Sequence, residues 1–213
     1  LWSLGSFFIR VLQHPTPLGL DDPPLSNLQV TFYRGLFAGL CLLPMVRPRD
    51  VRLRPKMVGM VGCFGVMSGL YMTALGDGNA ANAIFLQYTA PFWVYVVGVF
   101  VLGHPADRRS WRAILIGTAG AAVIVGGNWP WGVDAGRQGR DATILLMAAG
   151  SGAMYAAVIL FIGAQPGESP AWLSVLNLVG SAAVVAGFVA ATGDPKADVP
   201  FAAWVAAPTP GQF

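Results

Sequence analysis

Long apolar runs, separated by short polar loops, constrain this chain more than any other feature. A membrane-spanning helix needs about 20 mostly apolar residues. Only 11% of the 213 residues are charged, whereas soluble domains carry about 25%. The runs do not alternate as barrel strands would, so we expect an all-α, polytopic transmembrane helix bundle. The predicted spans are 26–46, 56–75, 80–102, 111–126, 142–163 and 171–192.

The first apolar run, 1–12, is too short to span a bilayer. Because no initiator methionine precedes it, we expect a helix cut at its N-terminus. The segment 208–213 similarly predicts a loop that leads to a helix beyond the chain. The chain is therefore expected to be a fragment that does not transport alone.

Residue types that carry enzyme or metal chemistry are scarce. The net charge is +3 without a contiguous basic face, so no nucleic-acid partner is expected. Cys41 and Cys63 lie in apolar runs, where a thiol acts as a small apolar group, and His14 and His104 stand in separate loops. The sequence therefore predicts no metal site, no cofactor and no catalytic residue.

The distribution of basic residues predicts the orientation. Eight of the 13 lysines and arginines fall in the loops 46–56 and 103–112. Because such residues gather on the cytoplasmic side, these loops are predicted to be cytoplasmic and the loop 127–141 external. We expect a multi-pass protein of the bacterial cytoplasmic (inner) membrane, with the lipid bilayer as its surroundings.

This orientation predicts an inverted repeat. Five helices are an odd number, so a second unit of five enters the membrane upside down relative to the first, as in many secondary transporters. We predict a first five-helix repeat at 1–127, an external loop at 128–140 and an incomplete second repeat at 141–213.

Arg34 is the most informative single residue. It falls inside the predicted span 26–46, and a cation there is costly unless it faces protein or water. It is interpreted either as a binding group for an anionic part of a substrate or as a packing group that bonds backbone carbonyls. Arg10, nearer the end of its run, is expected to snorkel to the interface.

The span 80–102 carries a polar arc that we interpret as a cavity wall. Pro91 in its middle frees a carbonyl of the preceding turn. Asn82, Thr89 and Trp93 fall on another face. The alternative for each residue is ordinary hydrogen bonding between helices. With Tyr71 added from the preceding span, the candidate substrate-binding residues are Arg34, Tyr71, Gln87, Tyr88, Pro91 and Tyr95.

Three segments resemble the EamA-like family of the drug/metabolite transporter superfamily. They are FYRGLFA at 32–38, AANAIFLQYTAPFW at 80–93 after an Ala-Leu pair at 74–75, and WRAILIG at 111–117 with Gly126-Gly127. Many relatives carry a glutamate just after the fourth helix, where this chain has LGHPAD at 102–107.

The resemblance implies a ten-helix carrier of two inverted five-helix repeats that exports small metabolites or drugs by alternating access. The chain would hold the first repeat and about two helices of the second. A small-molecule substrate is the implied partner, and homodimerisation stays open. The alternatives are a structural or accessory membrane subunit and a membrane-embedded enzyme, which would need acid, histidine or cysteine clusters at the interface.

Overall fold

The computed structural model describes residues 25–103, 105, 108–128, 135–194 and 201–206. Within these residues the regular structure is helical, with six candidate membrane spans, which confirms the predicted helix bundle. The spans are Asn27–Met45, Pro55–Asp77, Ala80–Phe100, Arg108–Gly127, Gly139–Gly163 and Pro170–Thr192. The predicted run 1–12, which contains Arg10, lies outside the described residues.

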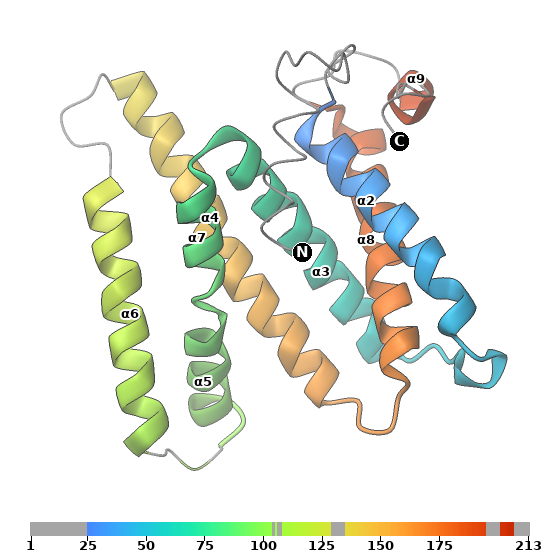
Figure 1. Ribbon diagram of the computed structural model, residues 1–213, viewed down its shortest axis with the longest axis horizontal. Coiled ribbons are helices and arrows are strands. Elements are labelled where there is room, and N and C mark those ends of the chain that lie inside the picture. Colours follow the sequence, from blue (N-terminus) through green and yellow to red (C-terminus); the bar gives the residue numbers. More distant parts are fainter. Residues whose placement is uncertain (1–24, 104, 106–107, 129–134, 195–200, 207–213) are drawn as a thin grey trace.

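Figure 1 shows the elements in chain order. They are α2 (Asn27–Leu42), η1 (Leu43–Met45), η2 (Pro48–Asp50), α3 (Pro55–Asp77), α4 (Ala80–Gln87), α5 (Ala90–Phe100), α6 (Arg108–Asn128), α7 (Ala135–Gly163), α8 (Pro170–Thr192) and α9 (Phe201–Ala206).

Local sequence sets several helix starts. Ser26 and Gln29 form a capping box, in which the Ser26 hydroxyl accepts from the Gln29 N–H and the Gln29 side chain accepts from the Ser26 N–H. The Asn79 side chain accepts from Ala81 N at 2.9 Å and so caps α4. A proline stands in the first turn of α3, α5 and α8, where its missing N–H costs nothing.

The predicted single helix 80–102 is wrong in one respect, because it is broken at Tyr88 and Thr89 into α4 and α5. Pro91 has no N–H to continue the ladder. Thr89 closes the end of α4 instead, since its N–H and its hydroxyl both donate to the Leu86 carbonyl, at 3.1 and 2.7 Å.

The predicted span 142–163 also differs at its start. Helix α7 begins at Ala135 rather than at 142, so part of the segment predicted as a loop, 128–140, is helical. Apolarity marks the part of a helix that lies in the membrane. It does not mark where a helix with polar first turns begins.

The helices run alternately up and down through the molecule (Figure 1). Helix α2 packs against α8, and α3 packs against α7 and α8. Helix α4 packs on α7, whereas α6 stands at one edge with no buried residue in its span. The basic residues between α2 and α3 and those at the start of α6 lie at the same end, as the predicted orientation requires.

Glycines allow the closest helix contacts. A β-carbon at Gly35 would lie 2.7 Å from the Leu178 carbonyl oxygen, so α2 and α8 touch backbone to backbone there. A β-carbon at Gly65 of α3 would lie 2.7 Å from the Val184 side chain of α8. The α2–α3–α8 packing is therefore fixed by small residues, as is common between membrane helices.

Candidate functional site

Arg34 lies about halfway along α2 and faces α3. Its side chain is half-buried, and Nη1 donates to Met72 Sδ across 3.8 Å. A thioether is a weak acceptor. The guanidinium itself carries five donors in a planar fork.

Two tyrosines share this region with Arg34. Tyr71 of α3 is only 4% exposed and lies within electrostatic reach of both Arg34 and Tyr88. Tyr88 follows α4 at the helix break and is 69% exposed. Tyr71 thus links three of the six predicted residues, from α2, α3 and the α4–α5 break, through its electrostatic interactions with the other two. We refer to Arg34, Tyr71 and Tyr88 as the arginine–tyrosine cluster.

Gln87 of α4 contacts α3, the helix that Arg34 also contacts. Its Nε2 donates to Met67 Sδ at 3.1 Å. Met67 and Met72 are five residues apart on α3, which is about 7.5 Å along a helix axis. Gln87 and Arg34 therefore contact the same stretch of α3.

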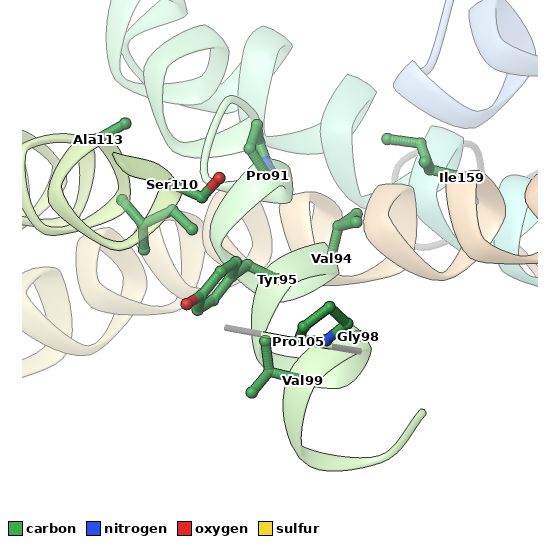
Figure 2. A pocket seen from close by; sticks show the side chains of 10 residues that line it. Pro91, Val94, Tyr95, Gly98, Val99, Pro105, Ser110, Ala113 and Ile159 are labelled. Carbon is green, nitrogen blue, oxygen red and sulfur yellow. The ribbon is translucent and has the colours of Figure 1, made fainter. Parts of the chain in front are cut away.

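Pro91 and Tyr95 lie elsewhere, in a groove of about 590 Å³ between α5 and α6. Figure 2 shows the two residues with Ser110 of α6 and Ile159 of α7 around this groove. The Tyr95 ring packs near Trp111, with centroids 6.1 Å apart. The groove is mainly apolar, and the other four candidates do not line it.

The helix break explains this division. The predicted arc assumes a continuous helix, in which Gln87, Pro91 and Tyr95 share one side. Because the ladder is interrupted at Tyr88 and Thr89, residues before and after the break do not keep that common direction. The residues of the predicted arc therefore lie in two separate regions of the structure.

Helix α7 packs closely against the break at Gly152. A β-carbon at Gly152 would lie 2.5 Å from Thr89 Oγ1 and 2.8 Å from the Leu86 carbonyl oxygen. Thr89 was predicted to lie on a face away from the candidate cavity, and its hydroxyl in fact contacts the α7 backbone. No pattern in the sequence near Thr89 indicates this contact.

Sequence reasoning also missed two buried carboxylates at helix ends. Asp194, which follows α8, is 9% exposed and accepts from Trp204 Nε1 at 2.7 Å and from the Ser26 hydroxyl. Glu168, between α7 and α8, pairs with Arg54 at 2.8 Å. Both lie outside the spans, and their burial depends on residues far away in the chain.

Among the residues that the structure describes, no group of histidine, cysteine or acidic side chains could hold a metal ion. A half-buried arginine within a multi-pass helix bundle commonly marks a substrate or ion pathway.

The chain belongs to the EamA-like transporter family, whose sequence pattern matches residues 1–126. It is similar to the pseudopaline exporter CntI of Pseudomonas aeruginosa, in strain UCBPP-PA14 and in strain PAO1. Each is 28% identical over 105 residues, which cover 47% of this chain and 37% of the exporter. The match therefore spans little more than a third of these relatives. No solved structure matches the chain.

Proposed function

We propose that the chain is part of a secondary carrier that exports small organic solutes with an anionic group, by alternating access across the bacterial cytoplasmic membrane. Family membership supports transport, and the exporter relatives support the direction. The observation that carries the proposal is the arginine–tyrosine cluster.

The chemistry of the cluster suits an anion. Arginine presents a planar fork of donors that matches a carboxylate or phosphate. Tyr71 lies within electrostatic reach of the guanidinium and of Tyr88, and each tyrosine carries a hydroxyl donor. A cation within a span is retained at a cost, and intramembrane cations commonly mark substrate pathways. We propose that Arg34 binds the anionic group and that the tyrosines orient it.

A buried hydroxyl next to the cluster supports a polar solute. Ser68 lies three residues before Tyr71 on α3, so the two share a helix face. The Ser68 Oγ is buried without a hydrogen-bond partner. Buried polar groups usually have partners, and a bound solute or water would supply one.

The packing of α2 on α8 supports inverted repeats. Ser26 at the start of α2 bonds Asp194 just after the end of α8, so these two helices are antiparallel neighbours. They are the second helices of the two predicted repeats. Two equivalent helices of opposite direction that pack together are the arrangement that a two-fold axis in the membrane plane produces.

Comparative export profiling tests the proposal and identifies the solute in the same experiment. Cells that express the full-length protein should enrich the medium in one or a few anionic solutes, measured by mass spectrometry against empty-vector cells. Arg34→Gln should abolish the enrichment, and Arg34→Lys should keep part of it because the charge persists.

Arg112→Gln is the matched control, because Arg112 is an exposed arginine on α6. Enrichment that survives in Arg34→Gln at the wild-type level, with equal membrane abundance, would remove the basis for this site. An exported solute without any anionic group would contradict the proposed substrate class. No exported solute would favour an accessory subunit.

A further inference from the structure

An ion pair joins the two predicted repeats at the end of the molecule that carries the basic loops. Arg54 stands just before α3, in the first repeat, and its Nη2 lies 2.8 Å from Glu168 Oε1. Glu168 belongs to the turn 164–169 between α7 and α8, in the second repeat. The pair therefore bridges segments that the chain separates by more than 100 residues.

A second contact crosses the same boundary. Trp172 Nε1, in the first turn of α8, donates to the Arg52 carbonyl oxygen at 2.7 Å. Residues 52–54 are thus attached to the start of the second repeat by a charged and a neutral interaction. We refer to these two interactions as the inter-repeat latch.

The two charges of the latch differ in exposure. The Glu168 side chain is 5% exposed, whereas that of Arg54 is 49% exposed. A buried carboxylate is strongly destabilised when its partner is removed. The Arg54 guanidinium, by contrast, is half exposed and stays solvated without its partner. The ion pair therefore matters more for the buried Glu168 carboxylate than for Arg54.

An apolar plug lies next to the latch. It consists of Met57 and Met60 of α3, Val158 of α7 and Leu173 of α8. A β-carbon at Gly59 would lie 2.8 Å from the Phe161 ring, which shows how closely α3 and α7 approach here. This layer seals the seam between the repeats on the side of the basic loops.

One buried polar side chain, that of Gln165, lies against the plug at Met60. Gln165 is 3% exposed, and its Nε2 donates to the Phe161 carbonyl at 2.9 Å, but its Oε1 has no hydrogen-bond partner. A buried acceptor without a donor is unfavourable. Entry of water at this seam would supply a donor to Gln165 and so lower the cost of opening.

We propose that the inter-repeat latch is a gate, in which the Arg54–Glu168 pair holds the repeats together over the apolar plug and separates when the cytoplasmic side opens. This role rests on the alternating access of the proposed function. The pair itself is a contact between repeats whether or not the solute class is correct.

Thiol labelling tests the gate without a substrate. Met60→Cys, in full-length protein with Cys41, Cys63 and any further cysteine replaced by serine, places a single thiol in the plug. N-ethylmaleimide labelling in membranes then reports the accessibility of the plug. We expect slow labelling when the pair is intact and labelling several-fold faster in Glu168→Gln.

The exchanged pair, Arg54→Glu with Glu168→Arg, should return labelling to near the original rate. Asp50→Asn is the control, because Asp50 pairs with Arg49 at 3.9 Å within the same loop and does not cross between repeats. Unchanged labelling in Glu168→Gln would overturn the gate. An increase that the exchange does not reverse would assign the effect to lost packing and would also overturn it.

A reversible cross-link separates the gate from the proposed function. Arg54→Cys with Glu168→Cys, joined by a short bifunctional methanethiosulfonate, should stop export of a solute found by profiling, and a reductant should restore it. Export that continues in the cross-linked protein would contradict the gate but leave the transport function standing. A negative profiling experiment together with the expected labelling pattern would instead reject the proposed function alone.

Discussion

At the scale of single residues, the chain uses glycine where helices meet and polar side chains where helices end. Gly35 and Gly152 each face a carbonyl oxygen of another helix. At the far end from the basic loops, Trp204 of α9 is fully buried, and its carbonyl accepts from Gln29 Nε2 at 2.9 Å. A larger side chain at these glycines would therefore push the helices apart, and loss of a hydrogen-bond partner at these helix ends would leave a buried polar group unpaired.

Gly35→Val tests the closest of these contacts. A β-carbon at Gly35 would lie 2.7 Å from the Leu178 carbonyl oxygen and 3.0 Å from the Ser181 hydroxyl oxygen, so the helices must separate. Overpacking of this kind costs about 1–3 kcal/mol. We expect less folded protein and a lower thermal unfolding midpoint, followed by size-exclusion chromatography of heated membrane extracts.

Gly117→Val on α6 is the matched control for this prediction. A β-carbon at Gly117 has no neighbour within 4 Å, and the change in helix propensity is the same. Equal loss of folded protein in both variants would show that the close approach of α2 and α8 does not matter.

At the scale of the elements, the break between α4 and α5 decides where the candidate residues lie. Tyr88 at the break lies within electrostatic reach of Tyr71, whereas Pro91 and Tyr95 line the groove beside α6. Irregular backbone within a membrane needs partners from neighbouring segments. Thr89 and the close approach of α7 at Gly152 provide that support.

Thr89→Val should therefore destabilise the break. The substitution removes the hydroxyl that donates to the Leu86 carbonyl, and one such hydrogen bond contributes about 1 kcal/mol. Thr89→Ser keeps the donor and should stay close to the wild-type midpoint in the same heating assay. A valine variant as stable as the serine variant would contradict the role given to Thr89.

The sequence alone predicts part of this arrangement of helices and candidate residues. Apolarity alone located the six spans, because a membrane requires long apolar helices. Arg34 stands out in the sequence because a cation inside a membrane span is energetically costly. The arc on 80–102 could not anticipate the break, since Pro91 in a helix permits either a kink or an interruption, and the α7 backbone contact decides between them. The Arg54–Glu168 pair has no local signal, because it depends on how distant helix ends meet.

At the scale of the whole molecule, the helices pack side by side in a row, and the two edges of the row differ in how closely they are packed. The α2–α8 pair at one edge is closely packed, whereas α6 at the other edge is largely exposed (Figure 1). The region similar to the exporters covers 37% of their length.

Impermeant thiol labelling of intact cells tests the proposed orientation. Arg49→Cys, in the basic loop between α2 and α3, should be protected, and Ala202→Cys, on α9 at the other end, should be labelled. Both positions are exposed in the structure, so their difference reports the membrane side alone. Labelling at 49 with protection at 202 would invert the predicted topology.

Solute protection at the arginine–tyrosine cluster tests most directly whether Arg34 and the tyrosines bind the exported solute. Tyr88→Cys, in full-length protein without Cys41 and Cys63, should react more slowly with a thiol reagent when a solute found by export profiling is added. Tyr95→Cys, in the groove between α5 and α6, should react at an unchanged rate. Adding Arg34→Gln to the Tyr88→Cys protein should remove the protection. Protection at position 95 instead of 88, or protection at 88 that persists without Arg34, would contradict the account.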